Sequence, residues 1–107
     1  MGIYAVAPVE YEPYTTLVTW EVFEATFEDG TSSIHFIGSP DDEDGRGRVC
    51  SAIQSFDKDK KCGISRSGRH YILSGPPGYS NEAHYVWEFW KRKNKVISEV
   101  NVTKDYE

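Results

Sequence analysis

The alternation of apolar and polar residues predicts a β-hairpin in the first half of the chain. Residues 17–27 are rich in Val, Thr, Phe and Trp, a composition typical of strands. An Asp-Gly dipeptide at 29–30 follows, and it favours a two-residue turn. With that turn, Phe23 lies opposite Phe36 on the core side of the hairpin.

Within residues 17–27 the apolar positions change phase. One face carries Val18, Trp20 and Val22, and the other carries Phe23, Ala25 and Phe27. A strand that keeps one face buried cannot do this without an irregularity. We therefore expect a β-bulge or a strong twist near Val22.

The middle of the chain predicts a short helix and a second hairpin. Apolar residues at 49, 52, 53 and 56 share one helical face, and the acidic run 41–44 before them suits a helix dipole. Residues 62–74 then form strands around a Ser-Gly turn. In the expected register Ile64 faces Tyr71, Cys62 faces Leu73 and His70 faces Ser65.

A longer helix follows, starting after Ser80, which can act as its N-cap. Glu82 lies in its first turn and bases between 91 and 95 in its last, as the dipole favours. A ridge of Ala83, Val86, Trp87 and Trp90 can pack on the sheet. Tyr85 and Phe89 lie beside that ridge and are candidates for a partner or self-association surface. Residues 96–103 alternate as a last strand.

These elements predict one α+β domain over residues 1–107. We expect antiparallel β-hairpins with two helices packed on one side of the sheet, in the order ββ-α-ββ-α-β. Three Trp, seven Tyr and five Phe among 107 residues can supply the single core that this length allows. No apolar run approaches the roughly 18 residues of a membrane helix, and the first residues lack a secretory signal, so we expect a cytoplasmic protein.

Charge is distributed unevenly along the chain. Residues 1–45 hold ten acidic residues and no Lys or Arg, whereas residues 46–107 hold seven acidic residues and all twelve bases, for a net charge of -5. Either the two halves interleave and neutralise each other, or an acidic face meets a basic partner.

Our main functional expectation is a non-catalytic protein, without cofactor or metal, that binds a basic partner surface. Its contact residues would be the acidic residues around the first hairpin and after it: Glu24, Glu28, Asp29, Asp41, Asp42, Glu43 and Asp44. One alternative is a single-strand nucleic-acid binder that uses the bases Arg66, Arg69, Lys91, Arg92, Lys93 and Lys95. A third is a small enzyme with a His/Cys site.

Local motifs for other chemistry are incomplete. The acidic run matches part of a calcium loop, but the first and twelfth positions would be Pro40 and Ser51. The Gly-Pro-Pro-Gly sequence at 75–78 lacks phosphate-loop spacing. Two cysteines without CxxC spacing predict reduced, buried thiols. The three histidines have structural explanations: His35 opposite Glu24, His70 in the second hairpin, and His84 one turn before Glu88.

The second half of the chain resembles a family of small bacterial proteins of no known activity. The resemblance rests on SGRHYIL at 67–73, GPPG at 75–78, and AHYVW at 83–87 with Trp90. It implies that this half is one structural unit, and it assigns no catalytic residue. In size, acidity and aromatic content the chain also resembles phage-encoded inhibitors of bacterial defence complexes. That resemblance implies that the basic partner is a bacterial defence complex that binds nucleic acid.

Overall fold

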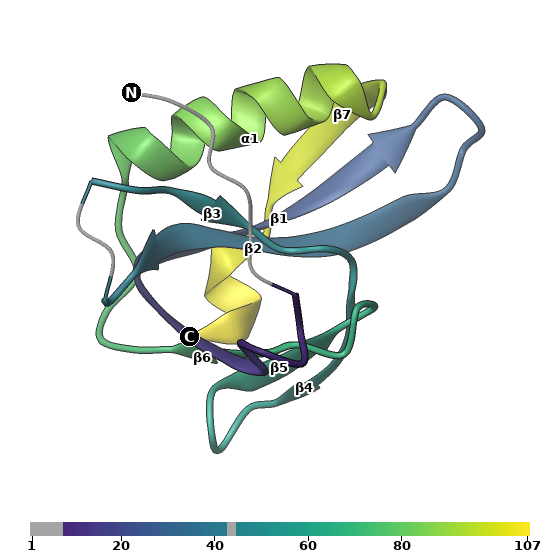
Figure 1. Cartoon of the computed structure of the whole chain (residues 1–107). Coiled ribbons are helices and arrows are strands. Elements are labelled where there is room, and N and C mark those ends of the chain that lie inside the picture. The colour runs from purple at the N-terminus through teal and green to yellow at the C-terminus, as the bar shows by residue number, and fades with distance from the viewer. Residues whose placement is uncertain (1–7, 43–44) are drawn as a thin grey trace.

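The computed structural model of the protein describes residues 8–42 and 45–107. In these residues it has seven strands, one α-helix and one 3-10 helix (Figure 1). They are β1 (Tyr14–Phe27), β2 (Ser32–Pro40), β3 (Arg48–Val49), β4 (Ile53–Asp57), β5 (Cys62–Ser65), β6 (His70–Leu73), α1 (Asn81–Lys93), β7 (Val96–Asn101) and η1 (Thr103–Tyr106).

All the strands belong to one sheet, in the order β3-β2-β1-β6-β5-β4, with β7 also paired to β1. Strand β1 changes its neighbour along its length. Its first residues, Tyr14 to Leu17, run parallel to β6, whereas Phe23 to Phe27 run antiparallel to β7. The pairing of β1 with β2 is irregular between Val18 and Glu21. The predicted interruption of this strand is therefore confirmed, slightly before Val22.

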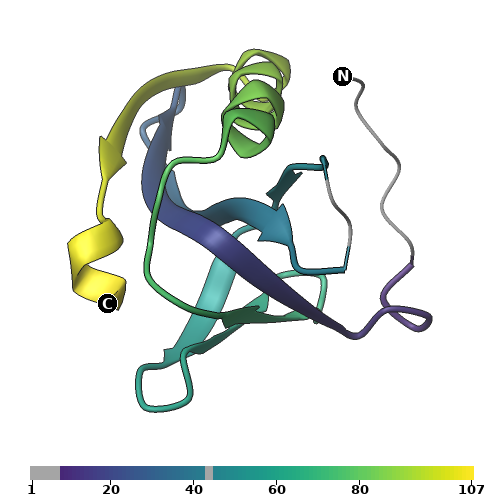
Figure 2. The ribbon, with the colours of Figure 1, turned by 90° about the vertical axis from the view of Figure 1, so that its left-hand side faces the viewer.

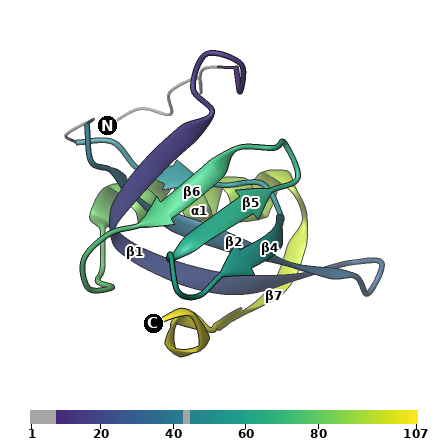
Figure 3. The ribbon, with the colours of Figure 1, turned by 90° about the horizontal axis from the view of Figure 1, so that it is seen from below.

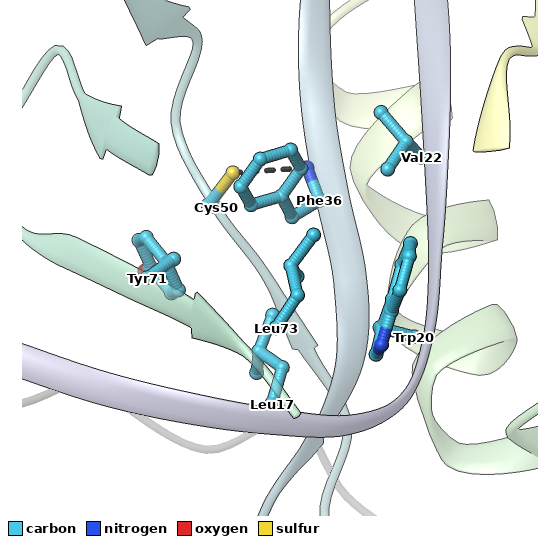
Figure 4. Packing of buried hydrophobic residues seen from close by; sticks show 7 residues of the cluster. All are labelled: Leu17, Trp20, Val22, Phe36, Cys50, Tyr71 and Leu73. Atoms are coloured by element: carbon cyan, nitrogen blue, oxygen red, sulfur yellow. Dashed lines mark hydrogen bonds between the residues drawn. The ribbon is translucent and has the colours of Figure 1, made fainter. Parts of the chain in front are cut away.

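The interruption gives the sheet a separate core on each side of β1 and β2. On one side, strands β4 to β6 curl beneath β1 and β2 until β4 contacts β2 (Figures 1 and 3). This curl encloses the first core, formed by Leu17, Trp20, Val22, Phe36, Cys50, Tyr71 and Leu73 (Figure 4). On the other side α1 covers the second core, formed by Phe23, Ala25, Ile37, Ala83 and Trp87 (Figure 2).

The predicted α+β fold, with two helices in the order ββ-α-ββ-α-β, is wrong, because residues 49–56 contain strands instead of a helix. Cys50, between β3 and β4, is buried and its Sγ accepts a hydrogen bond from the Phe36 backbone N–H at 3.0 Å. A register shift between Ile53 and Ser55 changes the phase of β4. The apolar residues of two short strands, separated by a bend and a bulge, thus have the spacing of one helical face. The result is a β-rich protein with a single seven-stranded sheet in the described residues.

Both predicted hairpins exist, but each register is shifted by one residue. In the first, Gly30 N–H donates to the Phe27 carbonyl and Phe27 N–H donates to the Thr31 carbonyl, both at 2.9 Å. The loop therefore has three residues, and Gly30 takes the positive φ of 88° that such a loop requires. Phe23 pairs with His35, and Phe36 pairs with Val22. Phe23 and Phe36 thus lie on opposite faces of the sheet.

The second hairpin repeats this difference. Gly68 N–H donates to the Ser65 carbonyl at 2.9 Å, and Gly68 has a φ of 91°. The observed partners of Tyr71, His70 and Ile72 are Gly63, Ile64 and Cys62. The expected pairs of Ile64 with Tyr71, Cys62 with Leu73 and His70 with Ser65 are therefore wrong.

The late helix follows the prediction. The Ser80 hydroxyl accepts a hydrogen bond from Ala83 N–H at 3.1 Å, and α1 has Glu82 in its first turn and bases in its last. Ala83 and Trp87 are buried, while Tyr85 and Phe89 are exposed. The strand after α1 also forms. Among the residues described, no helix combines the length and apolar character needed to cross a membrane.

Each phenylalanine on the two faces should be essential to its own core. We expect Phe23→Ala and Phe36→Ala each to lower the free energy of unfolding by about 3 to 5 kcal/mol, and Glu24→Ala to cost far less. Because Phe23 and Phe36 belong to different core clusters, the milder changes Phe23→Leu and Phe36→Leu should add within about 0.5 kcal/mol in a double-mutant cycle. Urea denaturation measures all of these. Strong coupling between the two positions would instead support the register with a two-residue turn.

Candidate partner-binding face

Glu24 lies at the centre of a sheet surface on the side of β1 opposite α1. Its register partners are Ile34 on β2 and Val100 on β7. Paired residues point to the same face, so these three side chains form a row across three strands. Ser32, Thr26 and Ser98 form the next row toward the hairpin tip. We call these six residues the open sheet face.

The open sheet face lies where the β1–β2 hairpin extends past β4, β5 and β6 (Figures 1 and 3). Three of its residues are exposed and three are half-buried: Ser32, Ser98 and Val100, and Glu24, Thr26 and Ile34, respectively. Val100 is 57% exposed, and Ile34 packs partly against the first core. A carboxylate between two aliphatic side chains on a rigid sheet combines charge with apolar area. Such a surface is suited to binding a protein.

The carboxylates of Glu24 and Asp105 both act on the phenol of Tyr106. Burial raises the pKa of Tyr106, and the negative charges of Asp105 and Glu24 raise it further. The phenol therefore stays protonated. The Tyr106 ring packs edge-on against Phe36 and Phe56 at centroid distances of 5.8 and 5.0 Å. These contacts hold η1, which carries Asp105, against the first core.

The hairpin tip adds Glu28 and Asp29, both exposed. Thr31 donates two hydrogen bonds to Oδ1 of Asp29, from its hydroxyl at 2.7 Å and from its backbone N–H at 3.0 Å. These two bonds lower the pKa of Asp29 and so favour its charged form, and the bond from the hydroxyl has the larger effect. Because Phe27 pairs with Val96, the tip also lies next to the basic end of α1.

The remaining predicted acidic residues lie elsewhere. Asp41 and Asp42 are exposed just after β2, whose nine residues separate them from the tip by about 30 Å. Glu43 and Asp44 fall outside the described residues. In sequence the acidic run is followed by β3 and not by a helix. Ser39, just before Asp41, lies near the start of α1, since Ser39 and Ser80 hydrogen bond through their hydroxyls at 3.0 Å. Among the described residues, Asp41 and Asp42 thus lie apart from the predicted contacts around the hairpin.

The basic residues proposed for nucleic-acid binding are also divided. Arg69 is buried, donates to the Glu12 carbonyl at 2.9 Å and lies 3.7 Å from its carboxylate. Lys91 is held between Glu88 and Glu99 at 2.7 and 2.5 Å. The other four are exposed: Arg66 at the tip of the second hairpin, and Arg92, Lys93 and Lys95 at the end of α1.

The histidines take partners that sequence did not indicate. His35 is buried: its Nδ1 lies 2.9 Å from the Cys50 carbonyl and its Nε2 lies 2.6 Å from the Ser33 hydroxyl. Because the register differs, it does not face Glu24. His84 bonds to Glu21 at 2.6 Å instead of Glu88, and its ring stacks on Tyr79.

The cysteines are not set up as activated nucleophiles. Burial raises the pKa of Cys50 to about 12. Burial also raises the pKa of Cys62, as does the charge of Asp57. Although Cys62 Sγ lies 4.0 Å from His70 Nδ1, the thiolate needed for nucleophilic attack is disfavoured. Over residues 8–42 and 45–107, no three His, Cys, Asp or Glu side chains are arranged to hold a metal.

Comparison with known proteins gave no match to a family model, a curated protein or a solved structure. The resemblance of the second half to small bacterial proteins therefore stays a prediction.

The buried position of His35 predicts a pH-dependent stability. Burial lowers its pKa, and the charge of Arg66 acts in the same direction, while the hydrogen bond to the Cys50 carbonyl opposes them. Below the unfolded pKa of about 6.5, the unfolded chain binds a proton that the folded protein does not, so the free energy of unfolding falls. Urea titrations between pH 8 and about 5.5 should show this slope, and it should be smaller in His35→Asn. Equal slopes in the two proteins would mean that the pKa of His35 is the same in the folded and the unfolded chain.

The divided basic set predicts weak nucleic-acid binding. Labelled single-stranded DNA and RNA should show no change in fluorescence anisotropy below about 10 μM protein at physiological salt. Two of the six bases are engaged with acidic residues, and the net charge of -5 opposes a phosphate backbone. Tighter, salt-sensitive binding that is lost when Arg92, Lys93 and Lys95 are changed to Gln would favour the nucleic-acid function instead.

Proposed function

We propose that the chain is a binding protein that contacts a basic surface of another protein through the open sheet face and the hairpin tip. The observation that carries this proposal is the row of Ile34, Glu24 and Val100 across β2, β1 and β7. Glu28 and Asp29 extend the negative charge toward the tip.

Each part of this surface has a physical task in binding. The carboxylates raise the rate of encounter with a basic surface through long-range attraction. The aliphatic groups beside Glu24 lose contact with water in the complex, which supplies affinity. The strands hold these side chains in place before binding, so little conformational entropy is lost. Asp41 and Asp42 add to the general field and make no contact.

The partner class follows from the charge of the face. A basic channel that normally holds nucleic acid presents the complementary surface, and the compositional resemblance to phage-encoded inhibitors favours such a channel in a bacterial defence complex. We propose a cytoplasmic location, where Cys50 and Cys62, both free thiols, remain reduced.

The proposal is tested with two variants of equal net charge. Glu24→Gln with Glu28→Gln removes two charges at the proposed contact, and Asp41→Asn with Asp42→Asn removes two at the far end of β2. The partner is first recovered by affinity purification from host lysate, and association is then followed by interferometry. We expect the first variant to associate about tenfold more slowly at low salt and the second to remain within twofold of wild type.

Two further readouts complete the experiment. Val100→Ser should speed dissociation without slowing association, because it removes apolar contact and no charge. Thermal melting should show that all variants remain folded. Equal association rates for the two charge variants would contradict the proposed face.

A further inference from the structure

The outer face of α1 carries a second exposed apolar surface, separate from the open sheet face. Tyr85, Glu88, Phe89 and Arg92 follow the spacing i, i+3, i+4 and i+7, so they form one stripe along the helix. This stripe, which we call the outer ridge, points away from the buried side marked by Ala83 and Trp87. Tyr85 and Phe89 are 50% and 43% exposed.

Beside the outer ridge lies a hollow of about 390 Å³. The four ridge residues line it together with Tyr79, Asn81 and His84. The Tyr79 ring stacks on His84 at a centroid distance of 4.2 Å and is itself 65% exposed. An aromatic side chain from another molecule can therefore enter between rings that are already ordered.

The charges on α1 identify what can cover this ridge. Glu82 lies in the first turn, whereas Lys91, Arg92 and Lys93 lie in the last. A second copy of α1 laid antiparallel brings the acidic start of each helix to the basic end of the other, and it also opposes their dipoles favourably. A parallel copy brings like charges together. The helix is thus complementary to itself in one direction only.

We propose that the outer ridge binds a second copy of this chain in an antiparallel, two-fold symmetric helix pair. A two-fold axis that passes between the two helices, perpendicular to them at the level of Trp87, places Tyr85 of one copy against Phe89 of the other, and Glu82 against Arg92. The ten residue steps from Glu82 to Arg92 span about 15 Å, so aromatic contacts occupy the centre and ion pairs the two ends. The contact is small, so the dimer is a weak one.

The dimer leaves the open sheet face free, because that face lies on the opposite side of β1 from α1. Two copies of the acidic face then act together on a partner with repeated basic sites. This inference does not depend on the proposed function, since Glu24 and Glu28 take no part in the helix pair.

Sedimentation velocity of the full chain over micromolar to millimolar concentrations tests the proposal. Wild type should shift from monomer to dimer, and Phe89→Asp should remain monomeric at every concentration. Tyr11→Asp is the matched control, because Tyr11 is also exposed, at 81%, but is not part of α1. We expect this variant to dimerise as wild type does. A wild type that remains monomeric would overturn the proposal and leave the ridge to a different protein.

Charge exchange tests the antiparallel arrangement itself. Glu82→Arg alone should be monomeric, because the introduced guanidinium would face Arg92 of the second copy, and Arg92→Glu with Lys93→Glu should be monomeric for the converse reason. An equimolar mixture of the two variants restores opposite charges at both ends and should dimerise again. Circular dichroism confirms that each variant is folded. Two monomeric variants whose mixture stays monomeric would show that the helices do not pair in this direction.

Discussion

The whole arrangement depends on a break in the regular strand geometry of β1, between Val18 and Glu21. Thr19 there has a φ of 50°, a left-handed conformation that is costly for a β-branched residue. Trp20 holds the break in place: its indole N–H donates to the Gly75 carbonyl and its own carbonyl accepts from Gly78 N–H, both at 3.1 Å. Gly38 allows the approach, since a Cβ there would lie 3.2 Å from Trp20 Cα.

This break decides what each half of β1 can do. Before it, β1 pairs with β6 and closes the first core; after it, β1 pairs with β7 and supports α1. Because the strand has switched phase, Phe23 and Ala25 point to α1 and Glu24 points away. The open sheet face therefore follows directly from a strained turn that is held by a buried tryptophan.

Charge in the folded protein is partly neutralised between the two halves of the chain. Glu12 lies close to both Arg48 and Arg69, at 3.5 and 3.7 Å, and both arginines are almost fully buried. Glu21 similarly binds His84. Two of the ten acidic residues in the first half, Glu12 and Glu21, thus have basic or imidazole partners inside the fold. Near the hairpin, Glu28 and Asp29 are exposed and Glu24 is half-buried, and these are the acidic residues that we propose for the contact with a partner.

Sequence predicted the features that depend on neighbouring residues. The Ser80 cap, α1, the interrupted β1 and the position of both turns are local, and the structure contains them. The length of the first turn is not determined by neighbouring residues, because Gly30 can end a two-residue or a three-residue loop. The three-residue loop moves His35 from the surface to the core. The strands at 49–56 and the pairing of β1 with β6 depend on contacts distant in sequence. The predicted acidic face failed for the same reason, since β2 separates Asp41 and Asp42 from the acidic residues at the hairpin.

The most direct test of this account is nuclear Overhauser spectroscopy of the folded protein at the Glu24 side chain. The proposed face exists only if Glu24 lies between β2 and β7 in the observed register. We expect cross-peaks from the Glu24 side chain to the methyl groups of both Ile34 and Val100. Cross-peaks from Glu24 to the His35 ring, with none to Ile34, would contradict the account.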